Sequence, residues 1–213
     1  MPKVRVHNFS VSLDGYGAGP RQSLEYPLGE GANRLHEWVF ETRSGRRMIG
    51  EEGGTTDTDD DFITQGEAGI GATIMGRNMF GPIRGPWGTD PWTGWWGDVP
   101  PFHHSVFVLT HYSRSPITMQ GGTTFHFVDR GIETALREAL DAANGKDVRI
   151  GGGVSTVQQY LRAGLIDDMH LAVVPALLGS GERLFDGSWA GYECVEFVSS
   201  PSVAHVRLSR KAA

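Results

Sequence analysis

Three consecutive glycines, Gly151 to Gly153, stand between a short apolar stretch and a segment with helical spacing. Glycines at such a junction let the backbone approach a ligand closely. The first turn of the following helix offers N–H groups and a positive dipole end, which together suit a phosphate, and Ser155 and Thr156 add hydroxyl groups there. The same residues can form a tight β–α turn without a ligand, and they do not match the GxGxxG fingerprint of a standard dinucleotide-binding domain.

A second candidate phosphate site is formed by Gly76 and Arg77, which directly follow the apolar stretch Ala72 to Met75. Arginine can bind a phosphate through two parallel hydrogen bonds, and Asn78 can cap a following helix. A surface arginine after a turn is the plainer interpretation of Arg77 alone. Because ligands of open α/β sheets bind at the carboxyl ends of strands, two such strand ends favour one shared anion site.

Tryptophans are concentrated between Gly85 and Phe102. The indole rings of Trp92, Trp95 and Trp96 can form a flat wall that suits a planar heterocyclic substrate. A local core of packed aromatic rings and a contact between two copies of the chain are the alternatives.

Other reactive side chains give weaker indications. His103, His104 and His111 have no cysteine or acidic residue at ligand spacing, so we predict no metal site. The acidic run Asp57 to Asp61 lacks the glycine and final glutamate of a calcium loop and is better explained by the first turn of a helix. Cys194 is the single cysteine, cannot form an internal disulfide, and is predicted to be packed in a strand.

Composition limits the class of protein. The 213 residues fit a single domain over 1–213, and the formal net charge of −6 argues against a nucleic-acid partner. No apolar run approaches the ~20 residues of a membrane span, and the N-terminus lacks a signal-peptide core. We therefore expect a cytoplasmic protein that acts on a small molecule.

Hydrophobic periodicity predicts strands that alternate with helices and a final antiparallel pair, so we expect an α/β fold with a mostly parallel sheet and an antiparallel C-terminal edge. Residues 16–58 are predicted to be irregular, apart from a short helical segment at 34–42. The predicted strands are 4–13, 72–75, 105–110, 124–128, 147–150, 169–175, 192–198 and 204–208, and the predicted helices are 62–69, 131–144 with Gly145 as C-cap, and 154–163.

Several of these motifs occur together in one known superfamily. Ile74-Met75-Gly76-Arg77, the strand at 106–110 and Ile150 with the three glycines resemble the dihydrofolate reductase superfamily in order and spacing. The turn Ser12 to Gly15 and the runs 163–171 and 174–181 resemble more closely the reductase domain of the bifunctional riboflavin-biosynthesis deaminase–reductase. The resemblance covers nearly the whole chain except insertions at about 16–58 and 84–103, and it implies a three-layer α-β-α fold.

The resemblance also implies roles for individual residues. Gly76 and Arg77 would lie along NADPH, with Arg77 near the adenosine 2′-phosphate, and Thr110 and His111 would border the adenine ribose. Gly151, Gly152 and Gly153 would hold the pyrophosphate, with Ser155 and Thr156 close by and a cis peptide bond at Gly151-Gly152. Asp14 and Gly15 would sit beside the nicotinamide.

On this basis we predict an NADPH-dependent reductase that transfers a hydride to a small heterocycle such as a pterin or a ribosylaminopyrimidine, and that pairs as a homodimer. Asp14 is the candidate proton donor, and a carboxyl group needs a raised pKa for that role near neutrality. The sequence shows no counterpart of the acidic residue on the first helix of true dihydrofolate reductases. A non-catalytic nucleotide- or flavin-binding module, or an interaction protein that uses its tryptophans, are therefore the alternatives.

Overall fold

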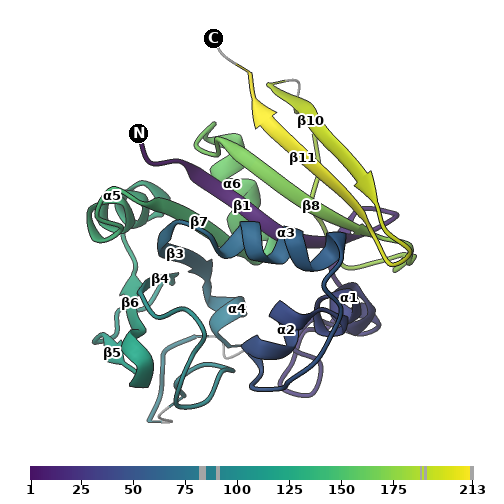
Figure 1. Cartoon of the computed structure of the whole chain (residues 1–213). Helices are drawn as coiled ribbons and strands as arrows, with labels where there is room; N and C mark the ends of the chain where they lie inside the picture. The colour runs from purple at the N-terminus through teal and green to yellow at the C-terminus, as the bar shows by residue number, and fades with distance from the viewer. Residues whose placement is uncertain (82–84, 90–91, 188, 190, 212–213) are drawn as a thin grey trace. The chain divides into compact units, whose positions relative to one another are not determined.

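A computed structural model describes residues 1–81, 85–89, 92–187, 189 and 191–211 (Figure 1). Its contacts divide the chain into two compact units. The first unit contains Met1–Arg5 and Gly69–Leu165, and the second contains Val6–Ala68 and the described residues from Ile166 onward. Residues 84, 90 and 91 of the predicted insertion at 84–103 lie outside the described residues.

The strands follow the predicted alternation. One sheet has the strand order β10-β11-β8-β1-β7-β3-β4-β6-β5. Its parallel pairs are β1 with β7, β7 with β3, β3 with β4 and β4 with β6, whereas β8, β11 and β10 pair antiparallel. The predicted mixed α/β fold with a mostly parallel sheet and an antiparallel C-terminal edge is therefore confirmed.

The first unit is built on strands rich in β-branched and aromatic residues, which favour a pleated and buried surface. Val106, Val108, Ile74 and Ile150 are fully buried. The helix α5 carries its buried alanines and leucine at helical spacing and packs on β3, β4 and β7, whereas α6 packs on β7 and β3. Of β1 (Val4–Ser12), only Val4 and Arg5 belong to this unit. Its other elements are β3 (Ile70–Gly76), α4 (Arg77–Phe80), β4 (Ser105–Leu109), β5 (Ile117–Thr118), η2 (Gln120–Gly122), β6 (Thr124–Val128), α5 (Ile132–Ala142), β7 (Asp147–Gly152) and α6 (Val154–Arg162).

The second unit places short helices and an antiparallel sheet around its own core, which includes Leu35, Trp38, Ile63 and Ala172. In this unit α3 lies against the sheet, because Phe62 stacks on His170 and on His205. The elements are β2 (Tyr16–Ala18), η1 (Ala32–His36), α1 (Glu37–Glu41), α2 (Arg43–Met48), α3 (Thr58–Glu67), β8 (Asp168–Val174), β9 (Glu182–Arg183), β10 (Tyr192–Ser199) and β11 (Ala204–Arg210).

Most of residues 16–58 lie outside helices and strands, as predicted, and η1 and α1 cover most of the short helical segment predicted at 34–42; β2 and α2 are additional short elements. Two local predictions are wrong. Asn78 caps no helix, because α4 already begins at Arg77 and its N-cap is Gly76. Cys194 is exposed rather than packed, because β10 is the edge strand of the sheet.

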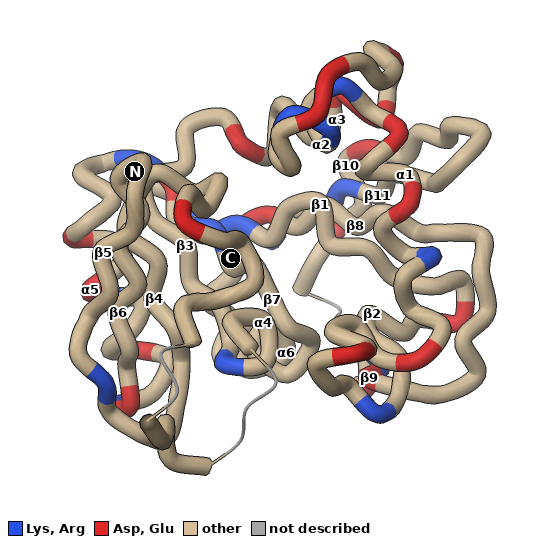
Figure 2. Tube along the Cα trace, turned by 90° about the horizontal axis from the view of Figure 1, so that it is seen from below, with Lys and Arg blue, Asp and Glu red and all other residues tan. Residues whose placement is uncertain are grey.

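Helix ends also differ slightly from prediction. The acidic run forms the first turn of α3 as predicted, and the Asp57 side chain caps it by accepting from the N–H groups of Asp59 and Asp60 at 3.1 and 3.4 Å. The C-cap of α5 is Ala143 rather than Gly145. Within the described residues, no helix is long and apolar enough to cross a membrane. Basic and acidic residues are interspersed along the chain (Figure 2).

Candidate functional site

The glycine bend of the first unit connects the last residue of β7 to the first turn of α6. Gly152 has φ 127°, a conformation that side chains with a β-carbon rarely adopt. The carbonyl of Gly153 accepts the N–H groups of Thr156 and Val157, both at 3.1 Å, and so begins the helix. The cis peptide bond lies at Gly152-Gly153, one residue later than predicted, because β7 continues through Gly152.

Gly76 lies directly beside this bend. β3 and β7 are parallel neighbours, and Met75 is paired with Gly152. A β-carbon on Gly76 would stand 2.3 Å from Oγ1 of Thr156 and 3.7 Å from the carbonyl oxygen of Gly152. The structure therefore brings together the two glycine segments that the sequence offered as phosphate sites, and only glycine at position 76 permits this approach.

The two hydroxyl residues of the first turn of α6 have different surroundings. Thr156 is buried and packs against Gly76, whereas Ser155 is exposed. Only the first N–H groups of a helix lack an intrahelical acceptor, so the amides of Val154 and Ser155 are available at this end. Ser155 therefore suits contact with an anion, and Thr156 suits the packing of the helix on β3.

Arg77 begins α4 immediately after Gly76. Its guanidinium Nη1 donates to the carbonyl of Gly85 at 2.6 Å, and its Cζ lies 3.7 Å from the centre of the Trp87 ring and 5.7 Å from that of Tyr112. The arginine is partly buried. Its charged group is therefore held in a fixed place next to the end of β3.

Thr110 and His111 follow the end of β4, which is the next strand in the sheet, with Leu109 paired to Gly76. Thr110 is buried, and its hydroxyl accepts the N–H of Tyr112 at 3.2 Å, so this side chain shapes the loop. His111 is exposed. The carboxyl ends of β7, β3 and β4 thus form one continuous edge that carries the predicted cofactor residues of the first unit.

The tryptophans form a local aromatic core. Trp92 donates its indole N–H to the carbonyl of Phe80 at 2.9 Å, and Trp96 stacks on Phe125. Trp95 meets Trp92 edge to face at 4.8 Å between ring centres. These contacts agree with the alternative in which the aromatic rings pack into a local core. A substrate wall made by Trp92, Trp95 and Trp96 stays a prediction.

Asp14 and Gly15 lie in the second unit, in the turn that follows β1. The Asp14 carboxylate accepts the N–H groups of Leu178 and Gly179 at 3.1 and 2.7 Å, and Gly15 accepts the N–H of Leu184 at 2.9 Å. A hydrogen bond from the Ser12 side chain and these backbone bonds lower the pKa of Asp14 to about 2. Since at pH 7 roughly one molecule in 10⁵ would carry the proton, these contacts fit an anchor of the turn better than a proton donor.

Acidic residues that the sequence analysis did not connect with catalysis lie in the first turn of α3. Asp59 and Asp60 are buried there, and Asp60 accepts the N–H of Ser44 at 2.7 Å. These acidic residues stand on the helix that directly precedes β3, as the acidic run predicted, and three shorter helices come before it in the chain. The signal was present in the acidic run 57–61, which was explained entirely by helix capping.

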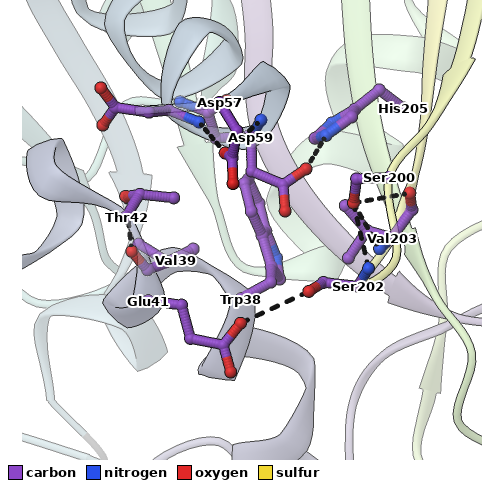
Figure 3. Close-up of polar contacts among 12 residues, drawn as sticks. Trp38, Val39, Glu41, Thr42, Asp57, Asp59, Ser200, Ser202, Val203 and His205 are labelled. Carbon is purple, nitrogen blue, oxygen red and sulfur yellow. Dashed lines mark hydrogen bonds and ion pairs between the residues drawn. The ribbon is translucent and has the colours of Figure 1, made fainter. Parts of the chain in front are cut away.

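Asp59 ends a buried chain of hydrogen bonds, and Figure 3 shows the bond that joins it to His205. Its Oδ1 lies 2.8 Å from Nε2 of His205, Nδ1 of His205 lies 3.0 Å from Nε2 of His170, and the backbone N–H of Asn8 donates to Nδ1 of His170 at 3.1 Å. Because the backbone N–H of Asn8 donates, Nδ1 of His170 is an acceptor, so a neutral His170 carries its proton on Nε2, which faces His205. Burial lowers the pKa of His170 to about 2, and the nearby charges of His7, His205 and Arg207 act in the same direction.

Among the described residues, no group of three or more His, Cys, Asp or Glu side chains lies close enough together to hold a metal ion.

Solved structures share this fold. A protein assigned to riboflavin biosynthesis from Shewanella sp. PV-4 matches with a TM-score of 0.59 and 22% identity over 100% of both chains. The diaminohydroxyphosphoribosylaminopyrimidine deaminase/5-amino-6-(5-phosphoribosylamino)uracil reductase of Thermotoga maritima matches with a TM-score of 0.57 and 14% identity, over 99% of this chain and 57% of the other. The dihydrofolate reductase of Enterococcus faecalis in complex with NADP(H) matches with a TM-score of 0.52 and 12% identity, over 99% and 97% of the two chains.

A family model confirms the resemblance that the motifs indicated. The model of the RibD C-terminal domain matches residues 2–200, which include the turn at Asp14, the strand end at Gly76 and the glycine bend. The chain belongs to the RibD C-terminal domain family.

Proposed function

We propose that this protein is an NADPH-dependent reductase that reduces a small heterocycle of the aminopyrimidine or pterin class. One observation carries the proposal: Gly76 and the bend Gly151 to Gly153 meet at adjacent strand ends, beside the N-terminus of α6. Membership in the RibD C-terminal domain family supports a reductase of the riboflavin or pyrimidine type. The NADP(H) complex of the Enterococcus faecalis relative in fold supports the choice of cofactor.

The residues of the first unit fit a dinucleotide phosphate. A β-carbon on Gly153 would meet nothing within 4 Å, so the backbone of the bend is open there, and the first N–H groups of α6 offer donors and a positive dipole end for a pyrophosphate. We assign the exposed hydroxyl of Ser155 to the same group. Arg77, held at the end of β3, would bind the 2′-phosphate, which distinguishes NADPH from NADH.

A bound NADPH would supply a hydride to a carbonyl or imine carbon of the substrate. The protein has to orient the reactants, exclude water and deliver a proton. The ionised Asp14 serves as an anchor that ties its turn to the backbone of Leu178 and Gly179.

Equilibrium binding and turnover test the proposal. We expect the protein to bind NADPH more tightly than NADH, and to oxidise NADPH when it is given one member of a panel of aminopyrimidines, pterins and quinonoid compounds. Arg77→Ala should weaken NADPH binding much more than NADH binding, because only NADPH carries the 2′-phosphate. An equal loss for both cofactors would remove that role from Arg77, and tight NADPH binding without turnover of any compound would favour the non-catalytic binding module.

A further inference from the structure

Trp87 makes the closest ring contact to Arg77. The Cζ of Arg77 lies 3.7 Å from the centre of the indole, a distance at which the guanidinium covers the ring face. A second arginine, Arg114, reaches the same indole with its Cζ at 4.9 Å. One indole thus contacts two cationic groups from separate segments of the first unit.

The indole itself is fixed from several sides. Its N–H donates to the carbonyl of Tyr112 at 2.8 Å. Phe80 and Phe127 meet it edge to face, with ring centres 5.9 and 4.9 Å away. A ring held by a hydrogen bond and two aromatic neighbours has one preferred plane, so it can impose that plane on a guanidinium stacked against it.

We propose that Trp87 is a positioning residue that holds the Arg77 guanidinium in the orientation from which it binds the 2′-phosphate of the cofactor. This inference rests on the proposed function, in which Arg77 recognises that phosphate. Trp87 itself touches no cofactor atom in the proposal, and it acts through Arg77.

Stacking suits this task because of the shape of the guanidinium. The group is planar and carries its N–H donors at its edge, so an indole against its face leaves the donors directed outward in the plane. The bond from Nη1 to the carbonyl of Gly85 fixes rotation within that plane. An arginine oriented in advance loses less side-chain entropy when it binds a phosphate, which increases affinity.

Arg114 contacts the same indole from another segment of the first unit. Its Nη1 donates to the carbonyl of Trp92 at 2.8 Å, which holds its guanidinium near the ring of Trp87. Both arginine contacts depend on the single ring of Trp87, which makes that ring the residue to test.

The test is a double-mutant cycle on cofactor binding. Dissociation constants of NADPH and NADH are measured by the change in nicotinamide fluorescence for the wild type, Trp87→Ala, Trp87→Phe, Arg77→Ala and the Trp87→Ala/Arg77→Ala double variant. Arg130→Ala is the matched charge control, because Arg130 is an exposed arginine of the same unit that pairs with Glu138. Thermal unfolding of each variant reports whether the aromatic core is intact.

We expect Trp87→Ala to weaken NADPH binding about three- to tenfold, as for the loss of one cation–π contact, with little change for NADH. Trp87→Phe retains a ring face and should restore most of the NADPH preference. The double variant should bind NADPH no more weakly than Arg77→Ala alone, because the ring acts through the arginine.

Other outcomes overturn the inference. If Trp87→Ala lost equal affinity for NADPH and NADH and also had a lower melting temperature, Trp87 would be a packing residue only. Additive losses in the double variant would show that Trp87 acts independently of Arg77. If the wild type binds neither cofactor, the proposed function itself is contradicted. If the wild type prefers NADPH and the Trp87→Ala variant keeps the same preference, only the positioning role is contradicted.

Discussion

Gly76 and Thr156 lie so close that a β-carbon on Gly76 would stand 2.3 Å from the Thr156 hydroxyl oxygen. Gly76 ends β3, and Thr156 lies in the first turn of α6, eighty positions later in the chain. This contact fixes the helix N-terminus next to the ends of two parallel strands. The proposed phosphate site exists because of it.

Gly76→Ala should therefore lower the free energy of unfolding by about 1–3 kcal/mol, the range for overpacking a well-filled interior. The Gly76→Ala/Thr156→Ala double variant removes the opposing hydroxyl and should recover most of that loss. Urea unfolding of the four proteins of this cycle measures both effects. A harmless Gly76→Ala variant, or a double variant that recovers nothing, would contradict the contact.

Ser155→Asp should change stability and cofactor binding in opposite directions. A carboxylate in the first turn of α6 interacts favourably with the helix dipole and should stabilise the fold by about 0.3–1 kcal/mol. The same charge repels a pyrophosphate, so NADPH and NADH should both bind at least tenfold more weakly, as measured by fluorescence titration. Ser155→Asn is the neutral control. Unchanged binding in Ser155→Asp would place the pyrophosphate elsewhere.

Asp14 should stabilise the second unit only in its ionised form. Its folded-state pKa, about 2, lies below the ordinary value of 3.8, so its contribution is present above pH 4 and is lost as the pH falls from 4 to 2. Asp14→Asn should lower the urea midpoint at pH 7 and reduce the loss of stability over that interval. The exposed Asp141 on α5 provides the control, Asp141→Asn. If Asp14→Asn instead abolished turnover with cofactor binding and stability unchanged, Asp14 would regain the role of proton donor.

His170 should make the protein sensitive to mild acid. Its pKa in the folded protein is about 2, whereas the ordinary value is 6.5. Between these two values the unfolded chain is protonated at this histidine and the folded protein is not, so the free energy of unfolding falls as the pH drops below 6.5. Between pH 6.5 and 5.0 this one group should lower the free energy of unfolding by about 1.6 kcal/mol. His36 and His104, whose pKa values burial lowers to about 4, act in the same direction.

His170→Gln should flatten this pH dependence, although it also removes the ring between Asn8 and His205 and lowers stability at pH 7.5. Urea unfolding at pH 7.5 and 5.0 measures both effects, and His111→Gln is the control on an exposed histidine. If the free energy of unfolding of His170→Gln fell between pH 7.5 and 5.0 by as much as that of the wild type, His170 would not be the neutral buried imidazole described above.

The sequence by itself determined the alternation of strands and helices, the glycine bend and Arg77 at a strand end. These features depend on spacing along the chain: apolar periodicity, the freedom of glycine and the residue types at strand ends are all local. The strand Thr124–Val128 was predicted with the bounds that the structure shows, since its β-branched and aromatic residues stand between clear turns.

Only the tertiary structure decided which of these residues meet. The contact between Gly76 and Thr156 depends on the register of β3 against β7, and the chain of Asn8, His170, His205 and Asp59 joins residues from four elements. The place of Arg77 against Trp87 depends on a segment without any periodic signal. Such contacts join residues far apart in sequence, and they are fixed by packing and by hydrogen bonds that no local pattern records.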